Sequence, residues 1–118
     1  MISTKEVAAR VVAALEDKKG LDIEILKIDE VTTLADYFVI CTGTSNTHVN
    51  ALTGSVEKTM DEVGEPLVSR EGHRSGTWVL LDYGSVVAHV FTEDTRKFYG
   101  LERLWNDAAR VTLDDIKN

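Results

Sequence analysis

The stretch that most constrains the fold is residues 78–91, WVLLDYGSVVAHVF. Two short apolar runs meet there at Gly84-Ser85, a composition typical of a β-hairpin with a tight turn. Pairing Tyr83 with Val86 puts alternate side chains on opposite faces, one of which includes Trp78, Leu80, His89 and Phe91. Asp82 is the one charged residue in this run, so both faces are largely apolar. Such a hairpin is either sandwiched between helices or leaves one face for a partner.

The chain before the hairpin reads as helix, strand, strand, helix. Residues 3–19 have an apolar stripe at helical spacing, a capping box of Ser3 and Glu6, and Gly20 as a left-handed stop. Strands are predicted at 22–28 and 36–42. A second helix is predicted over about 46–63, after a Gly43-Thr44-Ser45 turn in which Thr44 or Ser45 is the cap.

The rest of the chain predicts shorter elements. A short strand is expected at 67–69, a loop at 70–76, and a short helix capped by Thr92 that Gly100 interrupts. Residues 110–118 have little pattern and are expected to form a frayed tail. We therefore predict one domain over residues 1–118, of class α/β (α+β), in which helices cover one face of a mixed sheet of about five strands.

Composition limits the possible partners. The chain has 118 residues and a formal net charge of −7, with the acidic excess in residues 1–65. Such a charge disfavours nucleic-acid phosphates and is compatible with a basic protein partner. Cys41 is the single cysteine, which excludes an internal disulfide and a thiolate metal cage. The sequence has no signal peptide and no membrane-spanning run, so we expect a soluble cytoplasmic protein without a membrane partner.

Few residues suggest chemistry. The Gly43-Thr44-Ser45 turn lies between a strand and a helix, where phosphates often bind exposed amides. Nucleotide-transferring enzymes pair such a turn with two carboxylates that bind magnesium, but here Asp36 and Asp82 each stand alone. The three histidines have no metal-site spacing. We predict no catalytic residue, no cofactor and no metal, and the turn reads first as a helix cap.

Aromatic residues cluster in the last third of the chain. Tyr83, Phe98 and one tryptophan are expected in the core. Because the helices cover one face, the hairpin face with Trp78 is expected to be exposed unless a partner covers it. Burying a large apolar side chain is worth about 1.5–3 kcal/mol, and tryptophan is a favoured interface anchor. Core packing and interface use both remain open at this point.

Four segments carry a resemblance to a known family. In chain order they are DYFVICTGTSN, EG, WVLLDYGSVVAHVF and RKFYGLERLW. These segments resemble the ribosomal silencing factor family, also called Iojap-related. The resemblance runs in the family's order over residues 4–108. It implies a fold similar to nucleotidyltransferases but without their paired catalytic carboxylates.

The resemblance also implies a function. Members of this family bind the large ribosomal subunit through its L-fourteen protein, with little direct RNA contact, and block its association with the small subunit. They are also similar in forming homodimers off the ribosome. Carried over to this chain, the resemblance implies the contact residues Arg74, Trp78, Leu80, His89, Phe91, Tyr99, Leu101 and Glu102. Trp78 would be the apolar anchor, and Arg74 and Glu102 would be charges at the rim. Trp105 is expected in the core. The alternative is a small magnesium-dependent nucleotidyltransferase or nucleotide-binding protein that uses residues 43–45 with Asp36 or Asp82.

Overall fold

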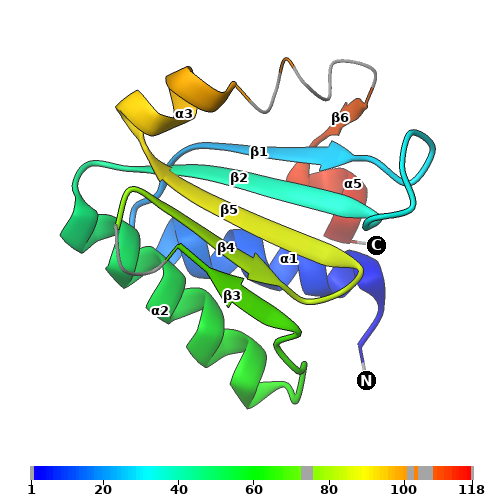
Figure 1. The fold of residues 1–118 in the computed structure, drawn as a ribbon. Helices are drawn as coiled ribbons and strands as arrows, with labels where there is room; N and C mark the ends of the chain where they lie inside the picture. Colours follow the sequence, from blue (N-terminus) through cyan, green and yellow to red (C-terminus); the bar gives the residue numbers. More distant parts are fainter. Residues whose placement is uncertain (1, 73–75, 101–102, 104–107, 118) are drawn as a thin grey trace.

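The computed structural model describes residues 2–72, 76–100, 103 and 108–117. It is a single α/β domain built on a six-stranded mixed sheet (Figure 1). The elements, in chain order, are α1 (Thr4–Asp17), β1 (Leu21–Lys27), β2 (Tyr37–Gly43), α2 (Asn46–Glu62), β3 (Ser69–Glu71), β4 (Trp78–Asp82), β5 (Val86–Thr92), α3 (Glu93–Tyr99), β6 (Ala109–Val111) and α5 (Leu113–Lys117). The predicted class is confirmed, and the sheet has one strand more than expected.

The strands lie in the order β3-β4-β5-β2-β1-β6. β2 and β5 are parallel, and the other neighbours pair antiparallel. The predicted hairpin register is confirmed, with Trp78 opposite Phe91 and Leu80 opposite His89. Gly84 makes the turn possible because its φ is +86°, in the left-handed region that disfavours other residues.

The two long helices begin as the sequence predicts. The Ser3 hydroxyl accepts the Glu6 amide at 3.2 Å, and the Ser45 hydroxyl accepts the His48 amide at 3.1 Å, so Ser45 rather than Thr44 caps α2. The end of α1 differs from the prediction. Lys19, with φ of +61°, takes the left-handed conformation instead of Gly20. Gly20 has a different role, because a Cβ there would collide with the Cys41 sulfur and so keep α1 away from the sheet.

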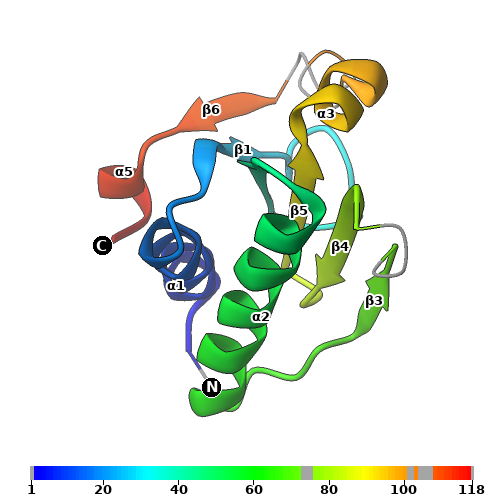
Figure 2. The same cartoon turned by 90° about the vertical axis from the view of Figure 1, so that its left-hand side faces the viewer.

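Helices α1, α2 and α5 lie on one face of the sheet (Figure 2). The main core fills the space between them and the sheet, and includes the helix residues Val11, Leu15, Leu52, Val56 and Met60. The opposite face carries a smaller apolar cluster, made of Leu26, Ile28, Ala35, Phe38, Ile40, Val87 and Phe91, with Trp78, Leu80 and Ala108 packed against it. We call this second side of the sheet the aromatic face.

The expected frayed tail is wrong. Residues 109–111 form β6, which pairs with β1, for example Ile25 with Val111. Helix α5 follows, and its Ile116 is 1% exposed in the core beside α1. These few apolar residues pack β6 and α5 against the rest of the domain. The short strand expected at 67–69 also begins later, because β3 spans Ser69–Glu71. In the described part of the chain, no helix is long and apolar enough to span a membrane.

Candidate partner-binding surface

The aromatic face is less exposed than the hairpin pattern predicts. His89 is 4% exposed and Phe91 is fully buried, so the expected exposure is wrong for both residues. β5 lies between β4 and β2, and the Phe38 ring of β2 packs edge-on against the His89 ring with centroids 4.7 Å apart. Trp78 and Leu80, on the neighbouring strand β4, are half-buried. A partner can therefore touch Trp78 and Leu80 directly, whereas His89 and Phe91, beside them on β5, are buried.

Trp78 is surrounded by other rings. Its ring centroid lies 4.5 Å from that of Tyr99 and 5.0 Å from that of Phe91. Its indole Nε1–H donates a hydrogen bond of 3.3 Å to His89 Nδ1. Aromatic pairs at these separations add to the stabilisation that burial supplies. The indole is thus fixed in orientation while part of its surface faces solvent.

His89 accepts this hydrogen bond in its neutral form. Because Nδ1 is the acceptor, the ring proton sits on Nε2, which has no hydrogen-bond partner among the described residues. Burial disfavours the charged imidazolium and lowers the pKa of His89 to about 4. At neutral pH the side chain is therefore an uncharged support for Trp78.

Helix α3 adds exposed aromatic surface next to Trp78. Tyr99 is 51% exposed and contacts Trp78, and Phe98 is 79% exposed with its ring 5.1 Å from that of Tyr99. The expected core position of Phe98 is therefore wrong, whereas Tyr83 is buried as predicted. α3 is a seven-residue helix with Gly100 as its left-handed C-cap. The side chain of Arg96 is its buried contact with the sheet.

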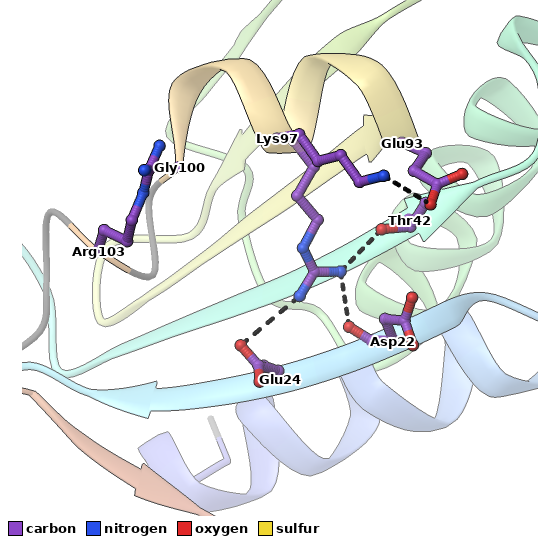
Figure 3. Close-up of a pocket in the computed structure, with 8 residues that line it drawn as sticks. Asp22, Glu24, Thr42, Glu93, Lys97, Gly100 and Arg103 are labelled. Carbon is purple, nitrogen blue, oxygen red and sulfur yellow. Dashed lines mark hydrogen bonds and ion pairs between the residues drawn. The ribbon is translucent and has the colours of Figure 1, made fainter.

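Arg96 ties α3 to the sheet through Asp22, Glu24 and Thr42, which are labelled in Figure 3. Its Nη1 donates to the Asp22 carbonyl at 2.7 Å and to the Thr42 hydroxyl at 2.8 Å, and its Nη2 lies 3.6 Å from Glu24 Oε2. Glu24 also pairs with Arg110 of β6 at 2.8 Å. The adjoining cavity of about 620 Å³ is lined by acids and bases together. No sequence pattern indicates this cluster, because its members lie far apart along the chain.

The turn between β2 and α2 is not arranged to hold a phosphate. His48 Nδ1 accepts the Thr44 amide at 2.9 Å, and His48 Nε2 lies 2.8 Å from the Lys18 carbonyl. One amide of the turn that a phosphate could use, that of Thr44, is therefore already bonded. The cavity beside this turn, about 330 Å³, has the acidic residues Asp22, Glu93 and Asp94 on its wall. Within the described ranges, no three His, Cys, Asp or Glu residues are grouped as a metal site.

Several predicted contact residues lie outside the described residues, namely Arg74, Leu101 and Glu102, and so does Trp105. Of the remaining candidates, the structure brings Trp78, Leu80, His89, Phe91 and Tyr99 together on or beside one face. The sequence reasoning did not single out Phe98 as exposed or Phe38 as a support. The parallel pairing of β2 with β5, which places Phe38 beside His89, cannot be read from the hairpin alone.

The fold and this surface define a small α/β domain that displays aromatic side chains at one end of a sheet. The model of the RsfS family, described as ribosomal silencing factor during starvation, matches residues 1–118. The chain belongs to this family, a family of ribosomal silencing factors.

Individual relatives agree with this assignment. The ribosomal silencing factor RsfS of Halalkalibacterium halodurans is 37% identical over 115 residues, which make up 98% of each chain. A crystal structure from Chromobacterium violaceum is 41% identical and has a TM-score of 0.87, covering 89% of this chain and 88% of that chain. A mouse protein named mitochondrial assembly of ribosomal large subunit protein 1 is 33% identical over 80% of this chain and 42% of its own length.

Proposed function

We propose that this protein is a cytoplasmic translational repressor that binds the large ribosomal subunit and sterically blocks its association with the small subunit. The contact is made with the basic L-fourteen protein, and the protein catalyses no reaction. The observation that carries the proposal is the half-buried Trp78, held by ring contacts and a hydrogen bond beside the exposed Tyr99. Rigid aromatic side chains of this kind are typical binding hot spots.

Membership of the silencing-factor family supports this function, and the name of the mouse relative supports the large subunit as the partner. The net charge of −7 favours a basic protein over ribosomal RNA, because phosphates are repelled by an acidic surface. The bonded turn amide of Thr44 and the acidic wall near it disfavour the nucleotidyltransferase alternative.

In this proposal the contact residues have different roles. Trp78, Leu80 and Tyr99 touch the partner, whereas the buried His89 and Phe91 support Trp78 from the neighbouring strand. Arg74, Leu101 and Glu102 complete the contact region as the family resemblance implies. Off the ribosome, two copies of the chain pair through the same aromatic surface, which removes it from water.

Co-sedimentation with purified large subunits, small subunits and joined ribosomes tests the proposal. We expect binding to large subunits and loss of joined particles. Trp78→Ala should weaken binding by about 2 kcal/mol or more, as hot-spot truncations do, while thermal denaturation shows that it still folds. Val68→Ala is the control, since Val68 is an apolar residue that is 66% exposed and precedes β3, where its amide bonds to the Asp82 carbonyl at the opposite end of β4 from Trp78.

The possible results separate the parts of the proposal. If Trp78→Ala binds like the wild type, the aromatic surface is not the contact. If the wild-type protein binds no particle, the function itself is refuted. Magnesium-dependent nucleotide binding that is lost on Asp82→Asn would then favour an enzyme or nucleotide-binding protein instead.

A further inference from the structure

The Glu71-Gly72 pair is one of the segments that carry the family resemblance, and the aromatic contacts do not account for it. A hollow of about 230 Å³ lies beside Trp78 and is lined by Glu71, Gly72, Trp78 and Leu80. We propose that this hollow receives one arginine or lysine side chain of the protein partner, with the Glu71 carboxylate pairing the cation. The partner's identity rests on the proposed function, but the chemistry of the hollow does not.

The sheet register puts the lining side chains together. Glu71 of β3 lies opposite Leu80 of β4, so both side chains are on the same face. Trp78 and Leu80 are two residues apart on β4 and also share this face. The hollow therefore has an aromatic side, an aliphatic side and a carboxylate at its edge.

Gly72 lets the chain pass close to Trp78. Its φ is +82°, and a Cβ at this position would collide with the Trp78 carbonyl oxygen. A side chain here would therefore force β3 away from β4 or change the backbone after Glu71. Gly72 thus lets the chain after Glu71 stay close to the backbone of Trp78.

Within the described ranges, the charge of Glu71 is not compensated by a cation. The residue is exposed, and no ion pair or hydrogen bond joins its side chain to another described residue. Two other glutamates are paired with arginines, Glu57 with Arg70 and Glu24 with both Arg96 and Arg110. An exposed carboxylate beside an apolar hollow is suited to a ligand that brings its own positive charge.

A long cationic side chain fits each part of this hollow. The methylene stem of lysine or arginine packs on apolar surface while the charged head stays at the edge. The head can lie over the Trp78 ring in a cation–π contact and pair with the Glu71 carboxylate, for arginine through two hydrogen bonds. The volume is below the roughly 300–1,000 Å³ of small-molecule pockets, so one side chain is a better match than a metabolite. A phosphate would be repelled by Glu71, which argues against RNA at this point.

A probe that needs no ribosome tests the hollow itself. The indole ¹⁵N–¹H signal of Trp78 is identified by its loss in Trp78→Phe and is followed during titration with the peptide acetyl-Gly-Arg-Gly-amide. We expect a saturable shift that a norleucine peptide of the same length does not produce, and that Glu71→Gln weakens about fivefold. No shift at tens of millimolar arginine peptide, or an equal shift with norleucine, overturns the proposal.

Binding to large subunits tests whether the hollow is used there. Glu71→Gln should weaken binding about fivefold and reduce its salt dependence. The control is Glu62→Gln, which makes the same charge change at an exposed residue of α2 on the other face of the sheet. If both variants bind alike, the hollow has no role on the ribosome. If the arginine peptide binds but the wild-type protein binds no large subunits, the proposed function is wrong. The proposal that the hollow receives a cationic side chain is then still supported.

Discussion

The buried histidine His89 makes the stability of the protein sensitive to mild acid. Its imidazole is neutral in the folded state because burial lowers its pKa from 6.5 to about 4. In the unfolded chain the same group is solvated and titrates near its ordinary value. Between these two pKa values the unfolded chain binds a proton that the folded protein does not, so stability falls as the pH falls.

The size of the effect follows from the two pKa values. A difference of one between the folded and unfolded pKa values corresponds to about 1.4 kcal/mol of stability. For His89 the two pKa values differ by roughly 2.5. The stabilisation is fully present above pH 6.5 and declines by about 1.4 kcal/mol per pH unit as the pH falls. Below pH 4 this stabilisation is lost, and the total decrease in the free energy of unfolding is about 3 kcal/mol. Protonation in the folded state also turns Nδ1 into a donor facing the Trp78 indole N–H, so their hydrogen bond is lost.

Urea denaturation at a series of pH values from 7.5 to 4.5 measures this effect. The comparison variant is His89→Asn, whose side-chain oxygen can accept the Trp78 indole N–H and which does not titrate. The smaller side chain lowers stability at every pH, so the slopes of the two stability curves are compared rather than their heights. The carboxylates contribute equally to both proteins and cancel in the difference.

We expect the wild-type curve to fall more steeply than the variant curve by about 1.4 kcal/mol per pH unit below pH 6.5. Parallel curves would show that His89 has the same pKa in the folded and unfolded states. The side chain would then be solvated, and the buried, neutral support for Trp78 described above would be wrong.

Four further predictions concern the scaffold. Gly54→Ala should raise the melting temperature, because Gly54 is an exposed position in the interior of α2 with open space around it. Alanine is favoured over glycine at such a position by about 1 kcal/mol. Gly20→Ala should lower the melting temperature, because the added Cβ would collide with Cys41. Ile116→Ala should cost about 2–4 kcal/mol in urea denaturation, a loss that a frayed tail would not show. Arg96→Ala should cost about 2 kcal/mol and speed amide hydrogen exchange in α3, while unchanged exchange would mean that the helix is held by other contacts.

Local signals in the sequence were sufficient for most of the fold. The helix caps at Ser3 and Ser45 and the hairpin register follow from neighbouring residues, and each is found as expected or as one of two alternatives. These features depend on contacts within a few positions of the chain, where residue type and spacing decide the geometry.

The errors come from contacts between distant parts of the chain. β6 and α5 have too few apolar residues to show a periodic pattern, and Ile116 becomes a core residue because α1 lies beside it. His89 and Phe91 are buried because β5 pairs in parallel with β2, a pairing that the sequence of the hairpin does not specify. Arg96 bonds to the Asp22 carbonyl, 74 positions away along the chain. The aromatic residues that the sequence singled out do lie together, but how deeply each of them is buried could not be predicted.

The carboxyl ends of the parallel strands β2 and β5 carry different kinds of side chain from the β3–β4 edge of the sheet. In open α/β sheets, ligands commonly bind outside the carboxyl ends of parallel strands. Here that position holds the turn bonded to His48 and the acids Glu93 and Asp94, which disfavour a phosphate. The exposed aromatic and unpaired acidic groups lie instead along the β3–β4 edge and on α3. Because such groups suit a basic protein surface better than a small anionic substrate, the distribution of side chains favours binding over catalysis.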